Sequence, residues 1–208
     1  RGNTRFKSST HRTPRFAQPG EPGQSLSLKL ELRILADIGI IGLPNAGKST
    51  LIQAITSANP KIGAYPFTTL SPKLGVIQSR SGRPIVLADI PGLIEGAHKG
   101  TGLGTQFLRH IKRTRLLLHL IDVSCINSDS PLEAYETVNT ELQLYEQALL
   151  EKPQVVVLNK TDLLNSDEST IQFEAALNDR EVLQISSLTG EGIKRLIAHL
   201  EDMLGRKI

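Results

Sequence analysis

The sequence predicts an α/β fold: a mostly parallel six-stranded sheet with helices on both faces, preceded by a short extended or β leader. Two observations lead to this prediction. From residue 36 onward, short apolar runs alternate with stretches of helical character, as they do in α/β proteins. Most of these runs are separated by segments long enough for a crossover helix, and such connections join parallel strands.

The expected elements follow one another in a regular order. We expect strands at Ile38–Ile41, Leu74–Gln78, Ile85–Asp89, Leu116–Val123, Val155–Leu158 and Val182–Ile185. We expect helices at Lys48–Ser57, Gly104–Thr114, Leu132–Leu150, Glu168–Leu177 and Gly192–Leu204. Only residues 79–84 separate the second strand from the third, and this is the length of a hairpin connection.

The leader has a different pattern. Apolar side chains occupy every even position from Leu26 to Ile34, with polar residues between them. This period of two predicts a half-buried antiparallel strand of a neighbouring sheet. The first 25 residues are rich in Arg, Ser, Thr, Pro and Gly and are typical of loop or extended chain. We therefore divide the chain into residues 1–34, a remnant of a preceding domain with its linker strand, and a main domain at residues 35–205.

The composition excludes several classes of protein. Hydrophobic residues make up 39% of the chain and charged residues 22%, which is typical of a folded globular protein and not of a disordered one. No apolar run approaches the ~18 residues of a membrane span, so we expect no membrane insertion. A single cysteine, Cys125, excludes an internal disulfide and fits the reducing cytoplasm. Because the first residue is Arg1, we expect a fragment or a processed product. We also expect the protein to be a monomer.

Positive charge is concentrated at the start of the chain. Residues 1–36 carry seven lysines and arginines against two glutamates, while the remainder is mildly acidic. Basic residues are interleaved there with aromatic ones: Arg5, Phe6, Lys7, His11, Arg12, Arg15 and Phe16. This mixture is able to contact RNA phosphates and stack on bases. The alternative interpretation is a solvated basic tail, which is common.

A glycine-rich loop follows the first expected strand directly and precedes the first expected helix. Its sequence, Gly42-Leu43-Pro44-Asn45-Ala46-Gly47-Lys48-Ser49, matches the P-loop pattern G-x-x-x-x-G-K-[ST] in the context that the pattern requires. Glycines let the backbone wrap a phosphate, and the helix N-terminus supplies partial positive charge. Lys48 is expected to reach the β- and γ-phosphates, and the Ser49 hydroxyl to ligate Mg²⁺. The predicted fold is therefore that of a P-loop NTPase.

Two further motifs stand at strand ends. Asp89-Ile90-Pro91-Gly92 closes the third strand, where an aspartate is able to hold a metal through water and the glycine N–H to meet a γ-phosphate. Asn159-Lys160-Thr161-Asp162 closes the fifth strand. A carboxylate at Asp162 is able to accept guanine N1–H and the 2-amino group together, whereas adenine offers neither donor. This favours GTP over ATP, with Asn159 near purine N7 and the Lys160 stem over the ring.

The remaining contacts are less specific. Ser186-Ser187-Leu188 follows the last strand and is able to offer backbone N–H groups to the guanine oxygen. The segment Tyr65-Pro66-Phe67-Thr68-Thr69-Leu70 is a candidate switch, in which Thr69, favoured over Thr68, completes the Mg²⁺ shell when GTP is bound.

The motifs together resemble the bacterial Obg (CgtA) GTPases. The similarity is carried by residues 42–50, 65–69, 88–97 and 107–111, and by residues 2–9 and 30–32, which resemble the end of the glycine-rich N-terminal domain of Obg. The resemblance implies GTP hydrolysis to GDP and phosphate and a role with the large ribosomal subunit, in its assembly and in growth control. It implies that the nucleotide is lined by Gly42, Leu43, Pro44, Asn45, Ala46, Gly47, Lys48, Ser49, Thr50, Phe67, Thr68, Thr69, Leu70, Ser71, Asp89, Ile90, Pro91, Gly92, Asn159, Lys160, Thr161, Asp162, Ser186, Ser187 and Leu188.

Leu93 stands where Ras-like proteins have a water-orienting glutamine, so we expect hydrolysis to be slow alone or assisted from elsewhere. Phosphoryl transfer also needs positive charge near the β–γ bridging oxygen. Asn45 is one candidate: in related loops such an asparagine helps to hold K⁺, which replaces an arginine finger. The alternative is that Asn45 only stabilises the loop. We thus expect Lys48, Asn45 and Thr69 to be catalytic, with Ser49 and Thr69 on the metal. The alternative function is a ribosome- or RNA-binding module whose hydrolysis is incidental.

Overall fold

The computed structural model describes residues 2–26, 36–56, 73–80, 82–89, 112, 114–163, 168–177 and 180–205. The chain forms two compact units, Arg1–Arg33 and Ile34–Ile208. The expected leader strand falls, apart from Leu26, outside the described residues. The proposal that residues 1–34 are the end of another domain stays a prediction.

The first unit has little regular structure. A 3-10 helix, η1, spans Asn3–Phe6. The Phe6 and Phe16 rings pack with their centroids 5.0 Å apart, and Asn3 Nδ2 donates to the Pro14 carbonyl at 3.4 Å. These contacts hold the two ends of a short basic segment together.

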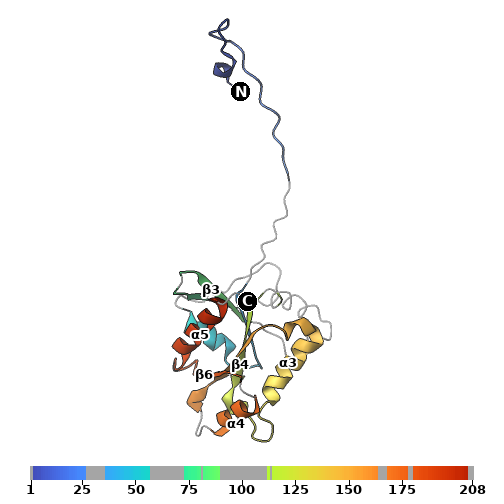
Figure 1. Cartoon of the computed structure of the whole chain (residues 1–208), viewed down its shortest axis with the longest axis vertical. Helices are drawn as coiled ribbons and strands as arrows, with labels where there is room; N and C mark the ends of the chain where they lie inside the picture. The colour runs from blue at the N-terminus through green and yellow to red at the C-terminus, as the bar shows by residue number, and fades with distance from the viewer. Residues whose placement is uncertain are drawn as a thin grey trace. The chain divides into compact units, whose positions relative to one another are not determined.

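The second unit is built on a six-stranded sheet (Figure 1). Its strands are β1 (Ile38–Ile41), β2 (Leu74–Gln78), β3 (Pro84–Asp89), β4 (Leu116–Asp122), β5 (Gln154–Asn159) and β6 (Val182–Gln184), arranged in the order β2-β3-β1-β4-β5-β6. Among the described strand pairs of this sheet, only the β2–β3 hairpin is antiparallel; β1 pairs in parallel with both β3 and β4, and β5 pairs in parallel with β4 and β6. The predicted mostly parallel α/β sheet is confirmed.

The described α-helices are α1 (Lys48–Ile55), α3 (Glu133–Tyr145), α4 (Glu168–Ala176) and α5 (Ile193–Gly205). Short 3-10 segments lie at Val123–Cys125 (η3), Gln147–Leu149 (η4) and Thr161–Leu163 (η5). The predicted helix Leu132–Leu150 was too long, because Glu146 takes an extended conformation (φ −164°) that ends α3. Most of the predicted helix Gly104–Thr114 lies outside the described residues.

The sheet has an apolar core on each face, and α5 and α3 lie on opposite sides of it in Figure 1. On one face, Ile38 and Ile40 of β1 pack with α1 and α5, including Leu51 and Leu196. Ile41, the residue that follows Ile40, belongs to the core of the other face and packs with α3. Alternate strand residues point to opposite faces, so central strands must be apolar on both. Every residue of β4 is buried for this reason.

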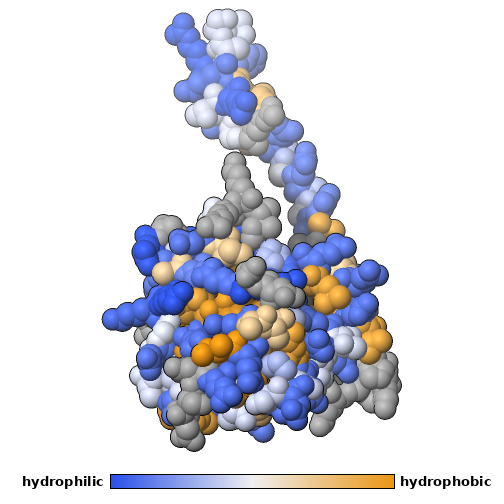
Figure 2. Space-filling model, turned by 60° about the horizontal axis from the view of Figure 1, so that its bottom comes forward, coloured by the Kyte–Doolittle hydropathy of each residue, from blue (hydrophilic) through white to orange (hydrophobic). Residues whose placement is uncertain are grey.

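Figure 2 shows a visible surface that is largely hydrophilic, with apolar side chains between the polar ones. The exposed large apolar residues come from separate elements, for example Val76 on β2, Leu144 on α3 and Ile171 on α4. Among the described helices, none combines the length and the apolar character that a membrane crossing needs.

Candidate functional site

The sequence motifs meet at one edge of the sheet. Parallel strands end at the same edge, and loops there form the binding crevice of α/β folds. Gly42 follows β1 directly, and Asp89 and Asn159 are the last residues of β3 and β5. The structure thus brings residues from three separate stretches of the chain together.

The loop after β1 requires two of its glycines. Gly42 has φ +149°, and a Cβ there would lie 2.3 Å from the Leu120 carbonyl oxygen. Gly47 has φ +95°, and a Cβ there would lie 2.4 Å from Asn159 Nδ2. Both positions combine a left-handed backbone with a close approach that any side chain would prevent. Asn45 is also left-handed, with φ +63°, and within the described part of the chain its exposed side chain makes no hydrogen bond.

Lys48 is the first residue of α1 and folds back over the loop. Its Nζ donates to the carbonyls of Gly42 at 2.9 Å and Leu43 at 3.0 Å. Burial lowers the pKa of Lys48, and the charge of Asp89 opposes that shift in part. The N-terminus of α1 has no side-chain cap, so its leading N–H groups face the loop without a partner from the preceding turn. A lysine and a helix N-terminus around a wrapped loop form a cradle for phosphate.

Ser49 and Asp89 form the second part of the site. Ser49 Oγ donates to Asp89 Oδ2 at 3.0 Å. The other carboxylate oxygen, Oδ1, is buried and has no hydrogen-bond partner among the described residues. Burial raises the pKa of Asp89, while the charge of Lys48 and the hydrogen bond from Ser49 lower it. A buried oxygen without a partner beside a hydroxyl fits a hard cation such as Mg²⁺, which binds few protein oxygens and keeps water and phosphate ligands.

Asn159 joins the phosphate loop to the loop after β6. Its side chain is fully buried. Nδ2 donates to the Ala46 carbonyl at 2.8 Å. Oδ1 accepts from the Ser187 backbone N–H at 3.0 Å and from Ser187 Oγ at 2.9 Å. The role of Asn159 in this structure is therefore to connect two loops, and its contact with a purine stays a prediction.

Asp162 lies on η5 with its carboxylate oriented by a neighbour. Ser186 Oγ donates to Asp162 Oδ1 at 2.5 Å and accepts from the Thr189 N–H at 3.1 Å. The hydroxyl is thus fixed by the loop after β6, and it orients the Asp162 carboxylate through one of its two oxygens. Leu188 is 78% exposed at the same loop. The structure brings Asn159, Asp162 and Ser186–Leu188 together as the sequence analysis expected.

One residue of this edge was missed. Asp122, the last residue of β4, pairs in register with Asn159 and accepts a hydrogen bond from Lys160 Nζ. The signal was available in the sequence, because a carboxylate at the end of an apolar strand is unusual unless it has a partner.

Other predicted residues lie outside the described part of the chain. They are Phe67, Thr68, Thr69, Leu70, Ser71, Ile90, Pro91 and Gly92, together with Leu93. Thr50 is described, and it is exposed on the first turn of α1.

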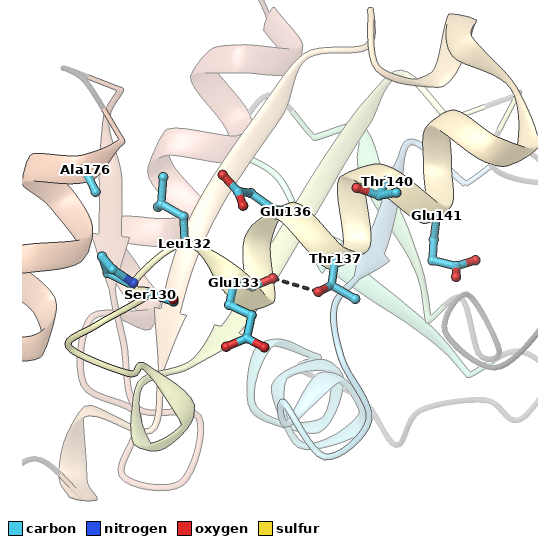
Figure 3. Close-up of a pocket in the computed structure, with 9 residues that line it drawn as sticks. Ser130, Leu132, Glu133, Glu136, Thr137, Thr140, Glu141 and Ala176 are labelled. Carbon is cyan, nitrogen blue, oxygen red and sulfur yellow. Dashed lines mark hydrogen bonds between the residues drawn. The ribbon is translucent and has the colours of Figure 1, made fainter.

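A separate groove lies at the start of α3 and differs from this edge in its chemistry (Figure 3). Glu133, Glu136 and Glu141 line it, and Thr137 Oγ1 donates to the Glu133 carbonyl at 2.8 Å. None of the described residues that line it is basic. Three carboxylates repel phosphate groups, so the groove does not compete with the loop after β1 as a nucleotide site.

The fold and the glycine-rich loop after β1 define a P-loop nucleotide-binding domain. Comparison with known proteins identifies the family to which this domain belongs. Residues 37–160 match the family described as 50S ribosome-binding GTPase, and the chain belongs to this family. It is 59% identical over 197 residues to GTPase Obg of Desulfatibacillum aliphaticivorans, covering 95% of this chain and 59% of that protein. It is also 59% identical over 207 residues to GTPase Obg of Desulforapulum autotrophicum, covering 100% of this chain and 59% of that protein. The resemblance to Obg proteins is confirmed, and the chain spans about three fifths of the length of these relatives.

Solved structures show the same fold. The second unit resembles a variant of Era from Aquifex aeolicus that was determined with GDP and aluminium fluoride. The two share 22% identity with a TM-score of 0.63, over 82% of this chain and 57% of that one.

Proposed function

We propose that this chain binds and hydrolyses GTP and acts as a nucleotide-controlled switch of the Obg type. The observation that carries the proposal is the joining of two recognition elements by one buried side chain. Asn159 holds the phosphate loop at Ala46 and the loop after β6 at Ser187. The same two loops carry the lysine expected on phosphate and the serine that orients Asp162. Phosphate and base recognition are thus parts of one rigid unit.

The chain's own groups account for binding of the triphosphate. Lys48 now donates to two carbonyls of its own loop, and a phosphate oxygen is a stronger acceptor for the same ammonium. Ser49 and the unpartnered oxygen of Asp89 would hold Mg²⁺, Asp89 through water, with Thr69 completing the shell. Mg²⁺ supplies charge neutralisation on the β- and γ-phosphates when it is bound. Asn45 is free to take part in holding K⁺, because its side chain is exposed on the same loop.

The partner proposed for the full-length protein is the large ribosomal subunit. The description of the matching family names the 50S ribosome, and the curated relatives are Obg GTPases. We infer a monomeric, cytoplasmic switch whose GTP-bound form differs from its GDP-bound form in the contacts offered to that partner.

The base assignment tests the proposal. Affinities for GDP, GTP, XDP and ATP are measured by calorimetry for the wild type, Asp162→Asn and the exposed control Asp202→Asn. The wild type should bind GDP and GTP far more tightly than ATP, since the Asp162 carboxylate finds its two donors only on guanine. Asp162→Asn should lose guanine affinity by more than about tenfold and gain XDP affinity, because xanthine has an oxygen where guanine has its amino group. Unchanged GDP affinity in Asp162→Asn would reject the assignment.

A further inference from the structure

The ends of β4 and β5 carry an ion pair between Lys160, which belongs to the base-recognition motif, and Asp122, which belongs to none of the motifs. Asp122 ends β4 and Asn159 ends β5, and the two residues are register partners. Lys160, the next residue, extends its side chain back across this edge, where Nζ lies 2.5 Å from Asp122 Oδ2. The two side chains are 31% and 10% exposed, for Lys160 and Asp122 respectively. The pair is therefore shielded enough from water to be stronger than a typical surface pair.

Asp122 is itself held rigidly. Its second oxygen, Oδ1, accepts from the Ser124 backbone N–H at 3.0 Å and from Ser124 Oγ at 2.6 Å. Burial would raise the pKa of Asp122, but the hydrogen bonds from Lys160 and Ser124 outweigh burial and hold the pKa below its usual value. The carboxylate is thus ionised at neutral pH and both of its oxygens are engaged. Its geometry suits an anchor for the lysine rather than a ligand-binding group.

The backbone of Lys160 has an unusual conformation that serves the same contact. Its φ is +68°, in the left-handed region that a residue with a Cβ adopts only at a cost in free energy. A 3-10 turn, η5, follows at once and carries Asp162. The lysine is therefore fixed at both ends, by its backbone beside Asp162 and by its ammonium at Asp122. Its four methylene groups have to cross from the end of β5 to the end of β4.

We propose that Asp122 is a positioning residue of the base site: it holds the Lys160 ammonium at the end of β4, so that the lysine stem forms a fixed apolar wall for the purine ring. This inference rests on the proposed function. A free lysine stem has many rotamers, and ordering it would reduce the affinity for nucleotide. Anchoring the ammonium in the apo protein removes that ordering cost before the base arrives.

A wall for the ring differs from an edge contact in what it recognises. The face of a purine is the same whether or not the 2-amino group is present, so Asp122 contributes equally to guanine and hypoxanthine nucleotides. Asp162, in contrast, accepts from the amino group and separates the two bases. The ratio of GDP to IDP affinity therefore distinguishes a residue that acts through the stem from one that acts on the base edge.

The test is a thermodynamic cycle on the whole chain. GDP and IDP affinities are measured for the wild type, Asp122→Asn, Lys160→Met and the double variant. Asp129→Asn serves as a control, because Asp129 is an exposed acidic residue of the segment after β4. We expect Asp122→Asn to weaken GDP and IDP binding by up to about tenfold each, the loss expected when one long, rotamer-rich side chain has to be ordered on binding. The double variant should bind no more weakly than Lys160→Met, because Asp122 acts through Lys160. Asp129→Asn should bind like the wild type.

Several results would overturn the inference. The first is a GDP affinity of Asp122→Asn within about twofold of the wild type. The second is a loss of affinity in the double variant that equals the product of the two single losses. The third is a loss of GDP affinity in Asp122→Asn without a similar loss of IDP affinity. If Asp122→Asn does not fold, Ser124→Ala replaces it, because it removes the hydroxyl donor to Oδ1 and leaves only the backbone N–H of residue 124 there. This loss should weaken both nucleotides about threefold, and no loss there overturns the inference as well. A wild type that binds no guanine nucleotide would instead reject the proposed function, and this inference with it.

Discussion

Replacing Asn159 by alanine is the most direct test of how the site is held together. The side chain is fully buried and makes three hydrogen bonds, one to the Ala46 carbonyl and two from Ser187. Ala46 and Ser187 are themselves 1% and 7% exposed. Water therefore cannot easily replace the lost amide, so three polar groups would remain without a partner.

The size of the effect follows from these groups. A buried polar group left without a partner costs about 1–3 kcal/mol, although the Ser187 hydroxyl is able to rotate toward another acceptor. We expect Asn159→Ala to lower the free energy of unfolding by about 3–5 kcal/mol, a large share of the ~5–15 kcal/mol that stabilises a typical domain. Ser187→Ala removes only the hydroxyl contact and should cost about 1 kcal/mol.

The assay is urea unfolding of the nucleotide-free chain, followed by far-UV circular dichroism. Asn127→Ala serves as a matched control, because Asn127 is exposed and, among the described residues, its Oδ1 accepts from the Asp129 N–H alone. This variant should change stability by less than about 1 kcal/mol. A loss for Asn159→Ala that is no larger than the loss for Ser187→Ala would refute the view that Asn159 is the common support of the two loops.

Three further predictions concern single positions. Gly47→Ala should abolish measurable nucleotide binding while the chain still folds, because a Cβ would lie 2.4 Å from Asn159 Nδ2 and push the loops apart. A GDP affinity of this variant equal to that of the wild type, measured by calorimetry, would contradict the prediction. Burial lowers the pKa of His119 to about 4, so as the pH falls from about 6.5 the unfolded chain takes up the proton first. The free energy of unfolding should decrease by about 3 kcal/mol between pH 6.5 and 4, and His119→Leu should reduce that decrease in urea titrations. At equal ionic strength, GTP hydrolysis should be faster in K⁺ than in Na⁺ by more than about threefold, and Asn45→Ala should remove this difference. Equal rates for the wild type in the two salts would exclude a role of K⁺ in hydrolysis. A difference that persists in Asn45→Ala would exclude Asn45 as a ligand of K⁺.

Local patterns in the sequence determined the elements and the order of the motifs. The strands Ile38–Ile41 and Leu74–Gln78 were predicted with their observed bounds, because apolar runs and the glycines and polar residues that end them are local signals. The phosphate loop was also found from its sequence, since its glycines are required by the backbone itself. Helix α3 shows the limit of such signals: the apolar period continues to Leu150, but the helix ends at Tyr145, where the backbone of Glu146 becomes extended.

The tertiary structure alone decided which residues meet. The place of β1 between β3 and β4 brings Ser49 to Asp89 across 40 residues of sequence and Asn159 to Ala46 across 113. The pairing of β4 with β5 sets Asp122 beside Lys160. No periodicity records these contacts, because strand order depends on how distant segments pack to bury both faces of the sheet. The motifs thus predicted the chemistry of this edge of the sheet, and the packing of the strands determined which side chains contact and support the motif residues.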